Sequence, residues 1–303
     1  MDVASKLIEL CSLHSSLDVR CQMSGEHTID HLRSAPGEAV FHMILSGKCL
    51  ITMTGAAPFL AKEGDLIIFP KGAAHRLTSI SSNIDGRDLM SRTQGLFAPA
   101  WINAEPCVEL DLLCGRIEYD IIAASLLFDS LPNVLHAVPE NTRPELCAIM
   151  RLIRYEAEAR RAEAEEVVTA LMSALFVIAL RQYLDTPQLD AGMLSLLADK
   201  SLSKSLVCMF KEAERNWTVE TLAFEVNMSR STFARHFRQI SGKGPAEMLL
   251  AIRCHLARNL LQTTNLSTGE IASRLGYQSE AAFGKAYTRY MNASPSATRR
   301  GLA

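Results

Sequence analysis

The sequence predicts an α+β fold, with a β-rich first part, a helical middle part and an all-helical last part. Short apolar or alternating runs, bounded by Gly, Pro, Ser and Asn, fill the first 120 residues, as in a series of β-strands. Beyond residue 144 apolar residues recur at helical spacing, and near the C-terminus one helical pattern occurs twice. A length of 303 residues suits about two domains of roughly 150 residues each. We expect domains at residues 1–135, 136–197 and 198–303.

The composition is that of a water-soluble globular protein. Hydrophobic residues make up 48% of the chain and charged residues 21%, which sets aside disordered, collagen-like and rod-like proteins. The longest nearly apolar run, Val167 to Leu180, is shorter than the roughly 20 residues of a membrane-spanning helix. The first residues do not form a secretory signal. We therefore expect a cytoplasmic protein without a membrane partner, whose eight cysteines are thiols, ligands or redox groups.

Four runs in the first part have the length and bounding residues of β-strands. They cover residues 39–45, 49–53, 65–69 and 106–114. Their spacing is typical of an antiparallel sandwich or barrel. Residues 80–105, which contain several Gly, Asn and Asp residues, predict a loop or a frayed hairpin.

Two consecutive helices are predicted in the middle part, at residues 145–161 and 163–183. They are a spacer, a dimerisation surface, or helices whose apolar faces pack on the β-domain, and the pattern does not choose among these. A third helical region is predicted at residues 198–215.

Charge is distributed unevenly along the chain. The whole sequence has a net charge of −2, but residues 211–303 hold 13 Lys and Arg against 7 Asp and Glu, a net +6. Residues 1–210 therefore carry −8. A basic C-terminal third on an acidic remainder favours a nucleic-acid-binding module joined to a second domain.

The C-terminal third contains an internal repeat. Leu222-Ala223 recurs 49 residues later, and three further positions recur after 50 residues, namely Phe233 as Phe283, Phe237 as Tyr287, and Pro245 as Pro295. Each copy predicts a helix, a tight turn, a second helix and an exit that proline marks. This is the pattern of two helix-turn-helix units, in which the second helix enters the DNA major groove.

In the first copy, the packing helix is predicted at Val219–Val226, and Ser229 is expected to cap the second helix. Phe233 and Phe237 must face inward in that helix, and Phe283 and Tyr287 in the second copy. The residues that then face outward, and that we expect to contact DNA, are Arg230, Ser231, Thr232 and Arg235 in copy one and Gln278, Ser279, Glu280 and Lys285 in copy two. Arg238 and Arg289 are expected to hold phosphate oxygens. Both recognition helices should lie about 34 Å apart, one turn of DNA.

These residues resemble the double helix-turn-helix domain of AraC/XylS-type transcription regulators. The resemblance covers about the last 90 residues and rests on positions that occur in order: Leu222-Ala223, Met228-Ser229, Phe233, Arg235, Phe237, Gly242, Pro245, Arg253, Ala257, Ile271-Ala272, Gly276-Tyr277, Phe283 and Pro295. Asn292 stands where the family usually has Gly, and Asn tolerates a left-handed backbone. Gly284 lowers helix propensity by about 1 kcal/mol inside the second recognition helix. Copy two is therefore expected to bind less rigidly or less specifically than copy one.

A second motif lies in the first domain. Residues 64–75 fit G-x5-P-x-G-x2-H, with His75 as the last residue, and resemble the second motif of the cupin family. The resemblance implies a β-barrel with His75 pointing inward. The first cupin motif is degraded, because only His42 and Gly47 stand in place of its two His, Glu and Gly. A metalloenzyme would thus lack half of its ligands, so we expect no enzyme activity.

His42 and His75 have two interpretations. They are either hydrogen-bonded core histidines or, together with Cys21 and Cys114, a tetrahedral set for zinc. The sequence does not show whether the four residues converge. Cys107 lies seven residues before Cys114, so the two should face opposite sides of one strand.

Cys21, His42, Gly47, the segment from Pro70 to Leu77, and Cys114-Gly115 resemble a narrower group of cupin-headed AraC-type regulators, which includes members that respond to reactive chlorine species through cysteine oxidation. This resemblance implies that Cys21 and Cys114 sense redox state. A thiolate near His or a metal reacts fastest with an oxidant, and a new disulfide or a lost ligand moves a strand.

The sequence therefore predicts a DNA-binding transcription regulator, an activator, that is switched by cysteine oxidation or by an electrophile in the cupin domain. The helical middle part would transmit the signal. Expected partners are double-stranded promoter DNA, RNA polymerase and a second copy of the chain. One alternative is a regulator that binds a reversible small-molecule ligand in the barrel, and another is a cupin metalloenzyme with a DNA-binding tether.

Overall fold

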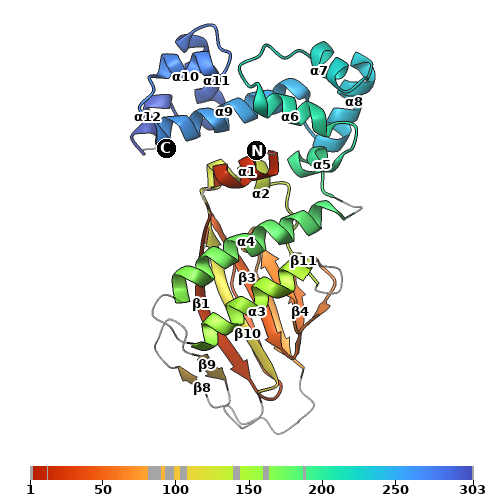
Figure 1. Ribbon diagram of the computed structural model, residues 1–303, viewed down its shortest axis with the longest axis vertical. Helices are drawn as coiled ribbons and strands as arrows, with labels where there is room; N and C mark the ends of the chain where they lie inside the picture. The colour runs from red at the N-terminus through yellow and green to blue at the C-terminus, as the bar shows by residue number, and fades with distance from the viewer. Residues whose placement is uncertain are drawn as a thin grey trace. The chain divides into compact units, whose positions relative to one another are not determined.

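The computed structural model has the α+β architecture that the sequence predicts (Figure 1). It describes residues 3–11, 13–80, 90–92, 99–102, 108–138, 144–159, 164–186 and 189–301. The chain forms two compact units. One, here called the β-unit, comprises Leu13–Tyr119 and Leu131–Thr186, and the other, the helical unit, comprises Met1–Ser12, Asp120–Ser130 and Pro187–Ala303.

The β-unit contains two sheets. Its strands are β1 (His14–Met23), β2 (Thr28–His31), β3 (Glu38–Ser46), β4 (Lys48–Met53), β5 (Phe59–Lys62), β6 (Leu66–Phe69), β7 (His75–Ser79), β8 (Met90–Arg92), β9 (Pro99–Ile102), β10 (Leu110–Glu118) and β11 (Leu135–Ala137). One sheet has the order β11-β6-β3-β10-β1-β9-β8 and the other β2-β7-β4-β5. All pairs are antiparallel except β1 with β9.

The core of the β-unit lies between these sheets. Alternate residues of the strands point into it, while β6 and most of β10 are buried on both faces. Its fully or nearly buried members are Cys21, Met23, Ile44, Cys49, Ile51, Ala61, Ile67, Phe69, Leu77, Leu110, Leu112 and Cys114. The predicted strands at 39–45, 49–53 and 65–69 are confirmed as β3, β4 and β6. The strand predicted at 106–114 is described from residue 110 to 118, and Cys107 lies outside the described residues.

Helices α3 (Pro144–Ala159) and α4 (Ala164–Leu184) belong to the β-unit and pack on each other, with α4 also against β1 and β11 (Figure 1). Within α4 the stretch Glu166–Leu184 is long and apolar enough, by length and composition, to cross a membrane. Part of this stretch packs in the β-unit, where Val168, Met172 and Leu175 are buried. Three interpretations of α3 and α4 were open, and the structure shows the one in which these helices pack on the β-domain.

The helical unit contains the remaining helices of the described chain. They are α1 (Val3–Cys11), α2 (Ile121–Phe128), α5 (Met193–Ala198), α6 (Ser203–Lys211), α7 (Val219–Glu225), α8 (Arg230–Ser241), α9 (Pro245–Thr263), α10 (Thr268–Arg274), α11 (Glu280–Met291) and α12 (Pro295–Arg299). The helical region predicted at 198–215 contains the shorter helix α6, and α5 precedes it, ending at Ala198. The long helix α9 runs from α7 and α8 at one end to α10, α11 and α12 at the other (Figure 1).

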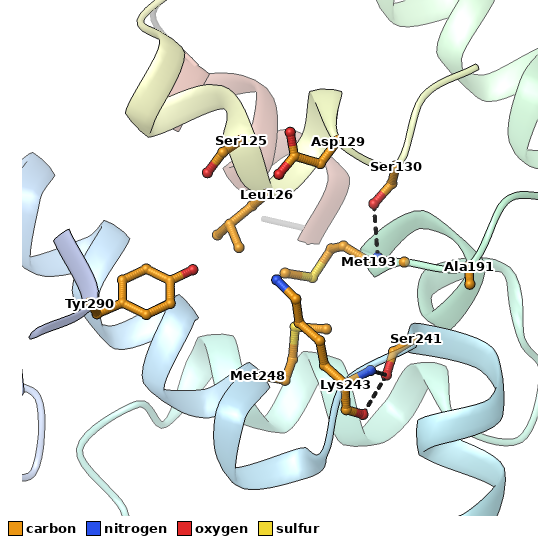
Figure 2. A pocket seen from close by; sticks show the side chains of 11 residues that line it. Ser125, Leu126, Asp129, Ser130, Ala191, Met193, Ser241, Lys243, Met248 and Tyr290 are labelled. Atoms are coloured by element: carbon orange, nitrogen blue, oxygen red, sulfur yellow. Dashed lines mark hydrogen bonds between the residues drawn. The ribbon is translucent and has the colours of Figure 1, made fainter. Parts of the chain in front are cut away.

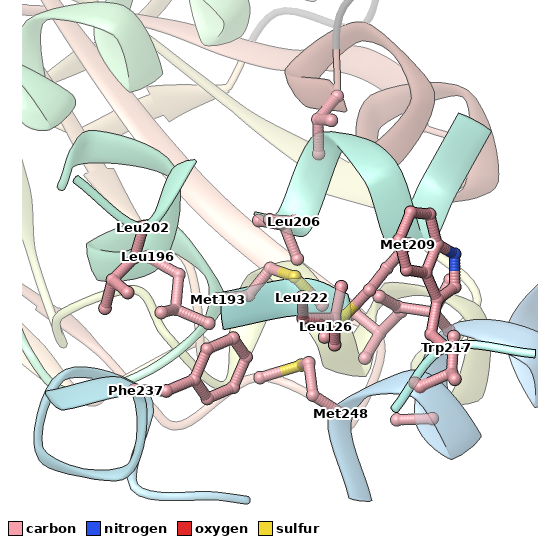
Figure 3. Close-up of a cluster of buried hydrophobic side chains, with 14 of the residues drawn as sticks. Leu126, Met193, Leu196, Leu202, Leu206, Met209, Trp217, Leu222, Phe237 and Met248 are labelled. Atoms are coloured by element: carbon pink, nitrogen blue, oxygen red, sulfur yellow. The ribbon is translucent and has the colours of Figure 1, made fainter. Parts of the chain in front are cut away.

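The unit boundaries differ from the predicted domains 1–135, 136–197 and 198–303. The reason is that α1 and α2, which lie in the β-rich part of the sequence, pack in the helical unit. Figure 3 shows Leu126 of α2 among the buried side chains of α5, α6, α7, α8 and α9. Val3 and Leu7 of α1 belong to the same core. A buried ion pair adds to this packing, with Arg258 Nη2 of α9 2.7 Å from Asp120 Oδ2. Helices α1 and α2 thus belong to the helical unit although each adjoins a strand of the β-unit in sequence.

Candidate functional site

The two predicted helix-turn-helix units are α7 with α8 and α10 with α11, and their first helices begin alike. Each starts with a capping box, Thr218 with Thr221 in the first copy and Ser267 with Glu270 in the second. In both, the cap hydroxyl accepts from a backbone N–H that would otherwise have no partner. The packing helix predicted at Val219–Val226 is observed at Val219–Glu225.

The turns of the two copies also match. Asn227 and Gly276, 49 residues apart, both have a left-handed backbone, with φ of 54° and 77°. In each copy the next amide closes the turn on the packing helix, from Met228 N to Ala223 O and from Tyr277 N to Ala272 O, both at 2.9 Å. The repeat seen in the sequence is therefore a repeat of backbone geometry.

The second helices carry the predicted caps and inward pairs. Ser229 and Ser279 cap α8 and α11 by accepting backbone N–H bonds. The inward aromatic residues Phe233, Phe237, Phe283 and Tyr287 have no exposed surface. Both helices end at a left-handed residue, Gly242 with φ 72° and Asn292 with φ 56°. The expectation that Asn292 replaces the usual glycine without loss of the turn is confirmed.

All ten predicted DNA-contacting residues lie on the exposed faces of α8, of α11 and of the turn before α11. They are Arg230, Ser231, Thr232, Arg235, Arg238, Gln278, Ser279, Glu280, Lys285 and Arg289. Arg230 Nε lies 2.7 Å from Glu220 Oε1 of α7, and both side chains are more than half exposed. Such an exposed pair contributes little stability, so Arg230 can exchange this carboxylate for a phosphate or a base. The DNA contacts of these residues stay predictions.

Arg253 of α9 joins the two copies, a role that the sequence pattern did not reveal. Its Nε donates to Ala213 O at 2.8 Å and its Nη2 to Arg215 O at 2.9 Å, in the segment before α7. Its guanidinium also lies over the ring of Tyr277, 5.5 Å from the centroid, in the turn of the second copy. Three backbone and ring contacts from one side chain thus hold the segment before the first copy and the turn of the second copy against α9.

A small pocket in the helical unit was also not predicted. It has about 100 Å³ of space and is lined by residues of α2, α5, α9 and α11 and of the segments beside them. Figure 2 shows the amino end of Lys243 extending into the space between Leu126, Met193 and Tyr290. The volume is enough for a few water molecules.

The predicted redox pair, Cys21 on β1 and Cys114 on β10, does come together in the core of the β-unit. In the antiparallel register Val19 faces Cys114 and Cys21 faces Leu112, so the two cysteines are diagonal neighbours on one face. Their thiols are hydrogen-bonded, which lowers the pKa of Cys21 and, with burial, raises the pKa of Cys114 well above its ordinary value. Cys21 is therefore the sulfur that ionises first, and Cys114 donates to it.

His42 on β3 connects this thiol pair to His75 on β7. His42 faces Cys114 across the strands, with Nδ1 3.0 Å from Sγ. Its Nε2 lies 2.7 Å from Nε2 of His75, and Nδ1 of His75 donates to Ala73 O at 2.7 Å. Burial lowers the pKa of His42 well below its ordinary value and that of His75 to about 4. Both imidazoles are therefore neutral at pH 7.

The predicted zinc set of Cys21, His42, His75 and Cys114 does not form one group. Cys114 contacts the edge of the His42 ring opposite to the edge that faces His75, so a single ion would not reach all four donors. Among the described residues, the donors that lie within 4.8 Å of one another are those of His31, His42 and His75. The sequence analysis missed His31 because no local motif marks this residue. Only the antiparallel pairing of β2 with β7 places His31 opposite His75.

The comparisons with known proteins match a different family to each end of the sequence. A family described as Cupin matches residues 2–185, and a family described as Helix-turn-helix domain matches residues 222–301. An HTH-type transcriptional regulator of Haemophilus influenzae, named as uncharacterised, is 31% identical over 100% of both chains. This chain belongs to the AraC-like, HTH-type transcription regulators with an N-terminal cupin domain.

Two further comparisons concern the whole chain and its C-terminal part. The RCS-specific HTH-type transcriptional activator RclR of Escherichia coli is 25% identical over 97% of this chain and 96% of its own length. A solved structure of the DNA-binding domain of AdpA with a target DNA is 34% identical, covers 34% of this chain and 93% of that chain, and has a TM-score of 0.32. Neither matching family description names a catalytic activity.

Proposed function

We propose that this AraC-like regulator binds double-stranded promoter DNA sequence-specifically through α8 and α11, acts in the cytoplasm and activates transcription with RNA polymerase. The observation that carries the proposal is the duplicated frame, which buries equivalent aromatic pairs and exposes a polar face at the same positions of both helices. The exposed Arg and Ser/Thr side chains of α8 suit base edges and phosphates.

Titration of the full chain against matched and scrambled promoter DNA at two salt concentrations tests this proposal. The matched sequence should bind about 10³-fold or more tightly, and both affinities should fall as salt rises. Equal binding to both sequences at each salt concentration would contradict specific recognition.

The proposed signal is an oxidant that joins Cys21 to Cys114. With hypochlorous acid, the Cys21 thiolate attacks chlorine to give a sulfenyl chloride and hydroxide. The Cys114 sulfur then attacks Cys21 sulfur, expels chloride and loses its proton, so that two thiols are oxidised and hypochlorous acid is reduced to chloride and water. The hydrogen bond between the thiols and the lowered pKa of Cys21 support this order. The likeness to the activator RclR, named for its response to RCS, supports the kind of oxidant.

Disulfide formation would shift the strands. Diagonal neighbours in an antiparallel pair have Cα atoms about 7–8 Å apart, whereas a disulfide holds them at roughly 4.4–6.8 Å. Strand β1 follows α1 after two residues, and β10 leads into α2 after two residues. Because α1 and α2 pack in the core of the helical unit, we infer that strand movement reaches the DNA-binding helices through them rather than through α3 and α4.

A reporter assay with Cys21→Ser separates the switch from DNA binding. The variant should keep basal promoter binding and lose its response to hypochlorous acid. Cys208→Ser is the matched control, because Cys208 is half-buried in α6 of the helical unit, and it should respond like the wild type. A Cys21→Ser protein that responds normally would eliminate this cysteine as the switch.

A reversible small-molecule signal is the second candidate. A hollow of about 360 Å³ in the β-unit is lined by Leu45, Glu63, Met150, Arg151 and Arg154, among others, and combines apolar surface with two cations and one carboxylate. An anionic apolar metabolite has the matching chemistry. Calorimetry on reduced protein would favour this candidate if such a compound binds while Cys21→Ser still responds to it.

The proposed homodimer would use α3 and α4. Leu152, Tyr155 and Val167 are exposed by 43%, 52% and 38%, which leaves apolar surface on these helices. Sedimentation of the full chain should show a dimer that Tyr155→Glu converts to a monomer. A wild-type chain that stays monomeric at micromolar concentration would contradict the dimer.

A further inference from the structure

We propose that His31, His42 and His75 bind one transition-metal ion of the Zn²⁺ type, each through one imidazole nitrogen. Their donor atoms all lie within 4.8 Å of one another, and the His42 and His75 Nε2 atoms are 2.7 Å apart. Zinc–nitrogen bonds of about 2.0–2.1 Å in a tetrahedral site put two donors about 3.3 Å apart. The 2.7 Å separation is below this value and the 4.8 Å limit is above it, so side-chain rotations would bring the three donors to the distances of a zinc site.

The lone pairs of the group leave a position that a metal ion can take in place of a proton. Because a carbonyl oxygen only accepts, Nδ1 of His75 must donate to Ala73 O, and the neutral ring then presents a lone pair at Nε2. That lone pair faces Nε2 of His42, so a proton or a metal ion must lie between the two nitrogens. His31 gives an independent indication, because its Nε2 is buried and has no hydrogen-bond partner among the described residues.

The site is accessible to an ion. His31 and His75 line an open hollow of about 470 Å³, together with Met53, Asp30 and Arg76 and their neighbours. This hollow leaves room for a fourth ligand such as water. The rings of His31 and His75 are stacked at 9°, so His31 must turn to direct its lone pair at a shared ion. With its Nε2 unpartnered, that nitrogen has no hydrogen bond to lose when the ring turns.

Neither thiol is a ligand in this proposal. Cys114 Sγ contacts Nδ1 of His42, on the side of the ring away from His75, which is the position of an outer partner that orients a metal-bound imidazole. His31 lies on β2, outside both cupin-like segments, so the site is not a remnant of the cupin ligand set alone. The thiol pair and the metal site would share one ring, that of His42.

Metal-free full-length protein, prepared by dialysis against a chelator, tests the proposal by Zn²⁺ titration against a chromophoric competitor. The wild type should bind one equivalent at this site, and His31→Gln should weaken it at least tenfold. His14→Gln is the matched control, because His14 is an exposed histidine of the same unit, and it should bind like the wild type. Circular dichroism verifies that each variant is folded, and Zn²⁺ should raise the Tm of the wild type more than that of His31→Gln.

Two further results decide the ligand set. Cys21→Ser and Cys114→Ser should keep the equivalent of Zn²⁺, and bound Co²⁺ should give a four-coordinate visible spectrum without a strong thiolate charge-transfer band. Loss of the metal in either cysteine variant would overturn the three-histidine site in favour of a mixed site. Absence of binding at micromolar Zn²⁺, or equal affinity of wild type and His31→Gln, would overturn it altogether. None of these readouts depends on DNA binding or on oxidation.

Discussion

The two helix-turn-helix copies have one frame but different exposed chemistry. Both have capped packing helices, a left-handed turn residue, buried aromatic pairs and a left-handed end. On their outer faces they diverge, because copy one exposes three arginines with Ser231 and Thr232, whereas copy two begins α11 with Glu280 and exposes Lys285 and Arg289.

The comparison distinguishes the buried residues that fix the position of a recognition helix from the exposed residues that would contact DNA. Buried positions of the two copies are constrained by packing, so they stay alike. Exposed positions have no such constraint and can differ with the half-site that each helix contacts. Copy one, which has more cations and no acid at the start of its helix, should supply most of the DNA affinity.

The largest effect on stability is expected at the left-handed turn residues, Gly276 in copy two and its counterpart Asn227 in copy one. The backbone at Gly276 has no room for a side chain. A Cβ at Gly276 would lie within the van der Waals contact distance of the Glu214 carbonyl and 2.9 Å from Arg253 Nη2, at a φ of 77°. Gly276→Ala should lower the free energy of unfolding by more than about 3 kcal/mol, because of backbone strain and steric overlap. Asn227→Ala should cost only about 1 kcal/mol. Hydrogen exchange of α10–α11 and of α7–α8 measures each copy separately, and equal losses in both would contradict this account.

An intermediate effect is expected at Arg235 and Lys285, which occupy equivalent positions 50 residues apart. Arg235→Ala should cost about 1–3 kcal/mol of specific binding and relax the sequence preference, if Arg235 reads a base. Lys285→Ala should weaken matched and scrambled DNA equally and reduce the salt slope by about 0.9, as for one phosphate contact. Larger loss of specificity with Lys285→Ala than with Arg235→Ala would reverse the assigned roles of the copies.

The helical unit was more predictable from sequence than the β-unit. Helix caps, inward aromatic pairs and turn residues are local signals, and Ser229, Phe233 and Asn292 were each assigned correctly from neighbours within four residues. Membership of α1 and α2 in the helical unit was not predictable, since it depends on contacts such as Arg258 with Asp120, 138 residues apart.

The candidate sensor site shows the same limit. Cys21 and Cys114 were expected to act together, and the β1–β10 pairing brings them together. The zinc set that joined them to His42 and His75 was one of two interpretations, and the sequence did not show whether its four donors converge; in the structure His42 and His75 are hydrogen-bonded to each other. A histidine ring can direct only one of its nitrogens at a given metal ion. His42 directs Nδ1 at Cys114 and Nε2 at His75, so one ion cannot bind all of these groups. His31 enters only through the register of β2 with β7, which no local motif encodes.

The smallest effect is expected at Gly284 and its counterpart Ala234, in the middle of α11 and α8. A Cβ at Gly284 meets nothing within 4 Å, so Gly284→Ala should stabilise α11 by about 0.5–1 kcal/mol through helix propensity alone. Ala234→Gly should destabilise α8 by a similar amount. Hydrogen exchange in each helix, followed by DNA titration, then tests whether Gly284 makes copy two the looser reader. If Gly284→Ala slows exchange in α11 without raising specificity, the weaker reading of copy two comes from its exposed side chains and not from its backbone.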